Sequence, residues 1–211
     1  MKSKKIYLVR HGQTEYNRKG IVQGSGIDAP LNDTGKEQAR RFYQAYSGVP
    51  FDKVYTSYLR RTMESVSGFL EDGLPHEKLA GLNEIHWGSK EGKPFTPDDH
   101  DEYLRIVDCW RNGDYEACIE GGESPTQVRE RLNDALEHIL ANENEEKILI
   151  CMHGRAMRVF LCLMLNYDLC HMDMFEHDNL CLYKLVYTGS LFQLEHFNDR
   201  RHLVTPEEVK A

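Results

Sequence analysis

Two histidines, His11 and His153, are the residues of this chain best placed to do chemistry. Each is followed by a glycine and preceded by a short apolar run, at residues 5–9 and 147–151. Both runs have the length and β-branched content of buried strands. Imidazole can act as a nucleophile near neutral pH because its ordinary pKa is about 6.5. Two strands ending at one sheet edge would bring both imidazoles over one pocket.

Arginines accompany the first histidine. Arg10 precedes His11, while Arg60 and Arg61 lie in the first turn of a helix expected after a strand at residues 51–56. A guanidinium beside an imidazole favours the neutral ring and can bind an anionic oxygen through two N–H groups. A helix start with an arginine nearby is typical of a phosphate site. Since neighbouring helical residues lie about 100° apart, we expect only one of Arg60 and Arg61 to face the pocket.

Glu84 is the candidate proton donor. It lies among apolar residues in a loop that includes Trp87 and ends at Gly88. Burial beside Trp87 would suit its carboxyl group to protonating a leaving oxygen. A solvated loop carboxylate is the alternative that this segment alone leaves open.

The elements that must position these residues alternate between strand and helix. Helices are expected from a capping box at Thr34 to residue 46, after a cap at Ser57, near residues 102–110, after a capping box at Ser124, and through residues 157–165. Two final strands, near residues 181–187 and 191–197, are joined by Thr188-Gly189. The order predicts one α/β domain over residues 1–211, a three-layer α/β/α sandwich with a mostly parallel sheet.

Composition narrows the functional class. The 211 residues carry a formal charge of −8, which argues against a nucleic-acid or anionic-membrane surface. No apolar run of about 18 residues is present, and a strand beginning by residue 5 leaves no room for a signal peptide. The six cysteines lack metal-site or disulfide-scaffold spacing, so we expect reduced thiols in the cytoplasm. Nothing in the sequence fixes an oligomeric state.

Several ordered blocks resemble the histidine phosphatase superfamily, which includes the phosphoglycerate mutases. The resemblance runs from Leu8 to about Leu165 and rests on Arg10-His11-Gly12-Gln13-Thr14 with Asn17, Gln23-Gly24, Pro30-Leu31 with Gly35 and Gln38-Ala39, residues 56–62, Leu82 with Glu84, Gly88 and Glu91-Gly92, residues 121–124, and His153-Gly154. It implies a phosphoglycerate mutase-like fold. Tyr58 replaces a common aspartate, and Ser89-Lys90 replace a frequent tryptophan, which affects substrate preference.

The resemblance also implies the chemistry. His11 would be the phosphorylated nucleophile and Glu84 the proton donor of a phosphomonoester hydrolase that acts on a small phosphorylated metabolite. The remaining site residues would hold phosphoryl oxygens or line the pocket, and they are Arg10, Arg61, His153, Asn17, Gln23, Gly24 and Gly154. No cofactor and no metal are expected, because arginines and an imidazole donor can stabilise the phosphoryl charge.

Two other kinds of centre are weaker matches. A cysteine-dependent phosphatase needs an arginine six positions after the cysteine, but Met157 occupies that position relative to Cys151. A metal site could use His171, Asp173 and His177, yet their spacing is not that of ligands on one helix face, and a solvated loop is expected.

Three other functions are weighed against the hydrolase. A non-catalytic phosphate-binding module would keep the arginines but lose the nucleophile or the acid, and both His11 and Glu84 are present. Phosphoglycerate mutase is the main alternative. Mutases of this superfamily have a longer insertion with paired arginines where this chain has only residues 92–123. A sugar bisphosphatase is the third alternative, since residues 56–65 and 148–158 are similar to that branch.

Overall fold

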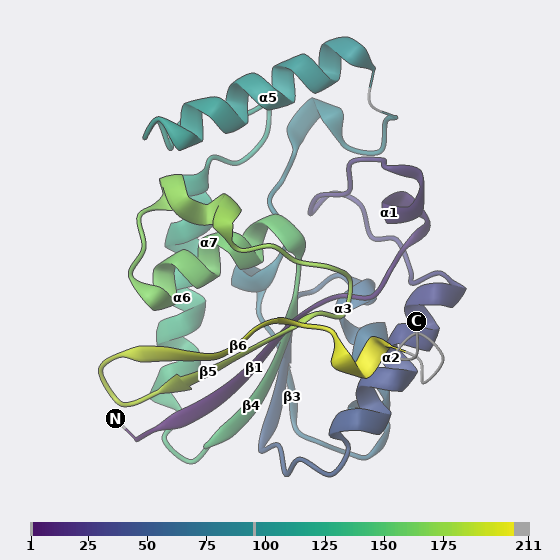
Figure 1. The fold of residues 1–211 in the computed structure, drawn as a ribbon, viewed down its shortest axis with the longest axis vertical. Coiled ribbons are helices and arrows are strands. Elements are labelled where there is room, and N and C mark those ends of the chain that lie inside the picture. The colour runs from purple at the N-terminus through teal and green to yellow at the C-terminus, as the bar shows by residue number, and fades with distance from the viewer. Residues whose placement is uncertain (1, 95, 205–211) are drawn as a thin grey trace.

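The computed structural model describes residues 2–94 and 96–204, and a six-stranded sheet runs through its centre (Figure 1). The strands are β1 Lys4–Arg10, β2 Lys53–Thr56, β3 His76–Lys78, β4 Lys147–Met152, β5 Leu182–Tyr187 and β6 Phe192–Asp199. Their order is β3-β2-β4-β1-β5-β6. The first four in this order pair in parallel, and β5 and β6 add an antiparallel edge. The predicted mostly parallel sheet is confirmed.

Helices cover both faces of the sheet. One face packs against α2 Asp33–Tyr46 and the short pair α3 Arg60–Ser65 and α4 Ser67–Glu71, and the other against α6 Pro125–Ala141 and α7 Gly154–Leu165. Two further helices, α1 Glu15–Lys19 and α5 Pro97–Arg111, lie beyond the carboxyl ends of the parallel strands (Figure 1). This arrangement confirms the predicted three-layer α/β/α sandwich.

Strand β1 is apolar at successive positions because helices cover both faces of the sheet. Ile6 and Leu8 belong to the hydrophobic cluster under α6 and α7, whereas Tyr7 and Val9 belong to the cluster under α2. Successive strand side chains point to opposite faces, so a strand with helices on both sides buries most of its residues, although Lys5 near the start of β1 is exposed. The parallel strands therefore form a rigid base for the residues that follow them.

Helix starts were predicted correctly only where the local signal was unambiguous. The Ser124 capping box is confirmed, with Ser124 Oγ accepting from the Gln127 N–H. The Thr34 cap is wrong, because Asn32 Oδ1 accepts from the Gly35 N–H at 2.9 Å and starts the helix at Asp33. The Ser57 cap is also wrong, because α3 begins only at Arg60.

Some elements were missed or shortened in the sequence reading. A single helical turn, α1, interrupts the loop expected at residues 13–33, and the three-residue edge strand β3 was not predicted. Helix α5 begins at Pro97 rather than near residue 102, because Thr96 and Asp99 form a capping box. Among the described residues, none of the helices is long and apolar enough to cross a bilayer.

The loop after β1 depends on a close backbone contact with α2. A Cβ atom at Gly35 would lie 2.1 Å from the Gln13 carbonyl oxygen, and one at Gly12 would lie 2.8 Å from the Gly35 carbonyl oxygen. The first turn of α2 therefore packs directly against the residues that follow His11.

This contact predicts that Gly35→Ala lowers the free energy of unfolding by about 1–3 kcal/mol, because a methyl group would push the two backbones apart. Gly48→Ala is the matched control, since nothing lies within 4 Å of a Cβ atom there. The control should change stability by less than about 0.5 kcal/mol. Urea unfolding of both variants checks this, and equal stabilities would contradict it.

Candidate active site

The carboxyl ends of β1 and β4 hold the two histidines together. Their parallel register pairs Arg10 with Met152, and the His11 N–H donates to the Met152 carbonyl oxygen at 2.9 Å. The imidazole centroids of His11 and His153 lie 5.1 Å apart. The prediction that both rings meet at one sheet edge is confirmed.

The His11 ring is neutral and held in one tautomer. Its Nδ1 lies 2.7 Å from the Gly12 carbonyl oxygen. A carbonyl only accepts, so Nδ1 carries the proton and Nε2 keeps a free lone pair. Burial, followed by the charges of Arg61 and Arg10, lowers the pKa of His11 well below its usual value. An imidazole in this state could attack as a nucleophile without a base to remove a proton.

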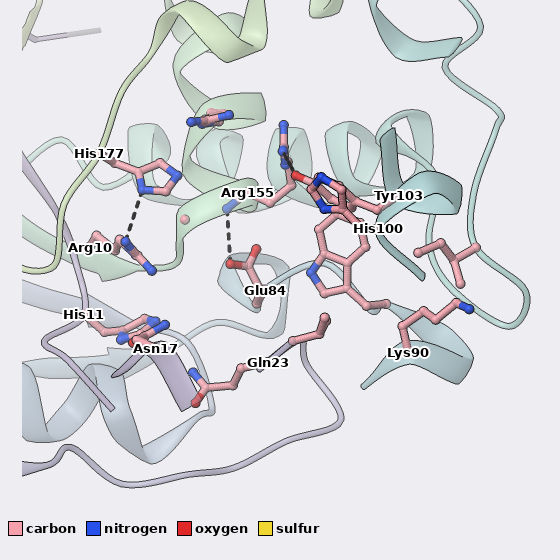
Figure 2. Close-up of a pocket in the computed structure, with 15 residues that line it drawn as sticks. Arg10, His11, Asn17, Gln23, Glu84, Lys90, His100, Tyr103, Arg155 and His177 are labelled. Atoms are coloured by element: carbon pink, nitrogen blue, oxygen red, sulfur yellow. Dashed lines mark hydrogen bonds between the residues drawn. The ribbon is translucent and has the colours of Figure 1, made fainter. Parts of the chain in front are cut away.

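A cavity of about 460 Å³ opens beside His11 (Figure 2). Two N–H donors on its wall, Arg10 Nε and Gln23 Nε2, are buried and have no hydrogen-bond partner among the described residues. Buried donors of this kind are rare in proteins unless a ligand or water completes them. An oxyanion bound at the His11 end would do so.

Loop residues beyond β1 shape this end of the cavity. Asn17 and Gln23 both line it, as predicted. Their amide oxygens are occupied by Thr14, since Asn17 Oδ1 accepts from the Thr14 N–H and Gln23 Oε1 accepts from Thr14 Oγ1. The Gln23 NH₂ group therefore faces the cavity as a donor. Gly24 lies outside the lining, where a Cβ atom would lie 1.9 Å from Glu91 Oε1.

Arg61 and His153 form a buried pair behind the cavity wall. Arg61 Nε donates to His153 Nδ1 at 3.2 Å, and His153 Nε2 lies 2.8 Å from Ser57 Oγ. Arg61 also donates to the carbonyl oxygens of Ile27 and Gly24, so three of its five N–H groups are used. Burial and the Arg61 charge lower the pKa of His153 well below its usual value.

Only one of the two adjacent arginines faces inward, as predicted. Arg61 is fully buried, whereas the side chain of Arg60 is exposed and pairs with Glu64 at 2.8 Å. Ser57, which does not cap α3, instead fixes the ring of His153.

Glu84 lies in the segment between β3 and α5 and contacts the start of α7. Only 6% of the residue is exposed. Its carboxylate accepts from the backbone N–H groups of Arg155 at 3.1 Å and Ala156 at 2.8 Å, and from its neighbour Ile85 at 2.9 Å. A helix N-terminus presents free N–H groups and positive potential, which suits a carboxylate. Glu84 lines the cavity, so the solvated-loop alternative is wrong.

Three residues that support the site were missed. Arg131 on α6 donates to the carbonyl oxygens of Gly81 and Asn83 and pairs with Glu123 at 2.8 Å, which fixes the Glu84 loop. Asn179 Nδ2 donates to the His11 carbonyl oxygen at 2.9 Å. Only Glu123 had a sequence signal, because it lies in the block at residues 121–124.

The structure also places the residues of the weaker alternatives. Cys151 is fully buried, and burial raises the pKa of its thiol, so it is the inert core cysteine that was expected. Asp173 pairs with Arg155 at 2.7 Å, while His177 Nδ1 lies 3.3 Å from Arg10 Nη1. Within residues 2–94 and 96–204, no three potential ligands are grouped to hold a metal ion.

Known proteins are similar to this chain in sequence and in fold. The family model for the histidine phosphatase superfamily (branch 1) matches residues 6–200. The chain belongs to the histidine phosphatase superfamily. A broad-specificity phosphatase of Saccharomyces cerevisiae is 31% identical over 166 residues, which are 74% of this chain and 68% of that protein. The fructose-2,6-bisphosphatase TIGAR of Mus musculus is 38% identical over 143 residues, 64% of this chain but only half of that protein.

A solved structure confirms the fold of this histidine phosphatase. The crystal structure of a putative α-ribazole-5′-phosphate phosphatase from Escherichia coli superposes with a TM-score of 0.83, covering 93% of this chain and 97% of that one at 24% identity. The phosphoglycerate mutase-like fold predicted from the resemblance is thus confirmed, and the chain is a phosphatase-type enzyme of this superfamily.

The buried histidines make stability depend on pH. Burial, then the charge of Arg10, lowers the pKa of His177 to about 2, below its value in the unfolded chain. The unfolded state therefore binds more protons below pH 6.5, and stability is lost as the pH falls through that value. We predict that His177→Asn loses about 1 kcal/mol less stability than wild type between pH 7.5 and 5.5. Urea titrations without phosphate measure this, and identical pH slopes would refute it.

Proposed function

We propose that this chain hydrolyses phosphomonoesters of small metabolites through a phosphohistidine at Nε2 of His11. The observation that carries this proposal is the neutral His11 ring, whose free Nε2 lies at a cavity with two unsatisfied donors, Arg10 Nε and Gln23 Nε2. A nucleophile without a proton and donors without an acceptor are together suited to an incoming phosphoryl group.

The first half-reaction transfers the phosphoryl group to His11. Nε2 attacks phosphorus in line with the leaving oxygen, so an N–P bond forms as the ester P–O bond breaks. Arg10 and Gln23 donate to the phosphoryl oxygens, whose negative charge they stabilise. In this proposal Glu84 carries a proton once the substrate is bound, because the negative phosphoryl group then lies beside it. It gives this proton to the leaving oxygen and so releases an alcohol.

In this proposal Arg61 and His153 act on the phosphoryl group from behind the cavity wall. Arg61 keeps two N–H groups beyond its three hydrogen bonds, and His153 fixes its direction through Nδ1. Asn17 and Gly154 line the cavity around the group, whereas Gly24 lies outside the lining and its carbonyl oxygen instead holds Arg61. The cationic charge comes from arginines, so the reaction as proposed needs neither a metal nor a cofactor.

The second half-reaction returns the enzyme to its starting state. Glu84, now ionised, takes a proton from a water that attacks phosphorus, and the N–P bond to His11 breaks. Inorganic phosphate leaves, and both His11 and Glu84 regain their original protonation. Residues 1–211 would act as one histidine phosphatase domain. The six free thiols fit a reducing cytoplasmic compartment.

The covalent step predicts a labelled enzyme. After rapid quenching with ³²P-labelled substrate in excess chelator, wild type should carry an acid-labile, base-stable label that is absent from His11→Ala. Each turnover should release one inorganic phosphate, whereas a mutase would return the group to an acceptor. Label surviving in His11→Ala would refute the assignment of the nucleophile.

The role of Glu84 can be separated from phosphate binding. Glu84→Gln should lose about 10²–10⁴-fold in kcat/KM with a sugar phosphate, whose alkoxide needs a proton, and much less with nitrophenyl phosphate. This comparison uses kcat/KM because it reports phosphoryl transfer to His11 and not the later hydrolysis, which is the same for both substrates. Arg61→Ala is the control and should slow both substrates alike, because the phosphoryl charge is the same in each. Equal losses for the two substrates in Glu84→Gln would mean that this carboxylate is not the acid.

A further inference from the structure

The part of the cavity beyond Glu84 contains more positive charge than the phosphoryl group needs. Among the described residues that line the cavity, four have a cationic side chain and only Glu84 has a carboxylate. Arg10 lies at the His11 end. Lys90 is neutralised by Asp99 and Glu102, each 2.6 Å from its Nζ. The remaining two cations are Arg155 and Arg158.

Arg155 and Arg158 share one carboxylate with a third arginine. Asp173 Oδ1 accepts from Nη1 of both, and Asp173 Oδ2 lies 3.2 Å from Arg111 Nη2. The side chains of Arg155 and Arg158 are only 9% and 19% exposed, whereas Arg111 is 55% exposed. Asp173, whose side chain is 23% exposed, thus serves both Arg155 and Arg158, and about one positive charge of this pair has no counter-ion among the described residues.

Hydrogen bonding at this arginine pair is also incomplete. Arg158 Nε is buried and has no partner among the described residues. Arg155, by contrast, is rigidly held, with Nη2 donating to Tyr103 OH at 2.6 Å and the guanidinium 5.4 Å from the ring centroid of Trp110. A fixed cation next to an unsatisfied donor is a site prepared for an anion.

This arginine pair lies on the leaving-group side of the reaction. The backbone N–H of Arg155 holds Glu84, while its side chain extends away toward Tyr103 (Figure 2). In Figure 2 Glu84 lies between His11 on one side and Arg155 and Tyr103 on the other. In-line transfer sends the leaving oxygen away from His11 toward the acid. The remainder of the substrate must therefore occupy the space that Arg155 borders.

We infer that Arg155 and Arg158 form a subsite for a second anionic group, a carboxylate or a second phosphate, on the leaving portion of the substrate. The substrates are then small phosphomonoesters that bear a further anion. Trp87, Val22 and Ile119 supply the apolar wall for the short carbon skeleton between the two charges. This inference rests on the proposed phosphatase function of the same cavity.

Matched substrates test the inference in the wild-type enzyme. 3-Phosphoglycerate and glycerol 3-phosphate differ only by a carboxylate in place of a hydroxymethyl group. We expect kcat/KM to be at least tenfold higher for 3-phosphoglycerate, or for fructose 1,6-bisphosphate over fructose 6-phosphate, and the pair with the larger ratio identifies the anion. Ratios near one for both pairs would overturn the inference.

Variants assign the effect to the two arginines. Arg155→Gln and Arg158→Gln should each reduce the preferred ratio about tenfold, mainly through KM, and Arg155→Lys should restore part of it by returning the charge. Arg111→Gln is the matched control, because it removes an ion pair to Asp173 from outside the cavity lining and should keep the wild-type ratio. A ratio unchanged in both Gln variants would refute the subsite.

Failure of the subsite and failure of the phosphatase function give different results. Nitrophenyl phosphate carries no second anion, so its hydrolysis by wild type, and the loss of that hydrolysis in His11→Ala, test the proposed function alone. Hydrolysis of nitrophenyl phosphate together with substrate ratios near one would reject only the subsite. Absence of all hydrolysis and of a phosphoenzyme would reject the proposed function and the subsite with it.

Discussion

The parallel pairing of β1 with β4 is the constraint on which the rest of the site depends. Its register sets Arg10 opposite Met152, so both strands end at one level and a histidine follows each. The hydrogen bond from the His11 N–H to the Met152 carbonyl oxygen continues the β1–β4 pairing one residue beyond β1, and it fixes the position of the His11 backbone. Because both strands are buried on two faces, a shift in register would expose their apolar residues. Core packing thus enforces the distance between the two imidazoles.

Burial then determines the protonation states. A charged imidazole is costly at a buried position flanked by arginines, so both His11 and His153 are neutral. The neighbouring groups also determine the tautomers, since Nδ1–H of His11 donates to the Gly12 carbonyl oxygen and Nδ1 of His153 accepts from Arg61 Nε. Both nitrogens of His153 are engaged, by Arg61 and Ser57, whereas among the described residues only the Gly12 carbonyl oxygen bonds to the His11 ring, at Nδ1. This asymmetry supports His11, rather than His153, as the proposed nucleophile.

The sequence predicted the parts of the site that local patterns encode. The structure has the two strands that end in His-Gly, the inward-facing Arg61 and the Glu84 loop where we expected them. Strand length and helical spacing are local properties, so the sequence alone could indicate them. Residues that act across the fold gave no such signal: Arg131 fixes the Glu84 loop from α6. Thr34 and Asn32 are both good capping residues, and the sequence could not choose between them. The contact of Gly35 with Gln13 belongs to tertiary structure, as does the pairing that makes residues 76–78 a strand.

In the proposed reaction, the start of α7 would link proton transfer by Glu84 to substrate choice by Arg155. In its first turn the backbone N–H groups of Arg155 and Ala156 bind the Glu84 carboxylate. The side chain of Arg155 leaves the same turn toward the outer cavity, where Asp173 and Tyr103 fix it. The backbone N–H that binds Glu84 does not depend on which side chain occupies position 155. The positive charge in the outer cavity does depend on that side chain. A helix start of this kind allows side-chain replacement to change the preferred leaving group while the acid stays in place.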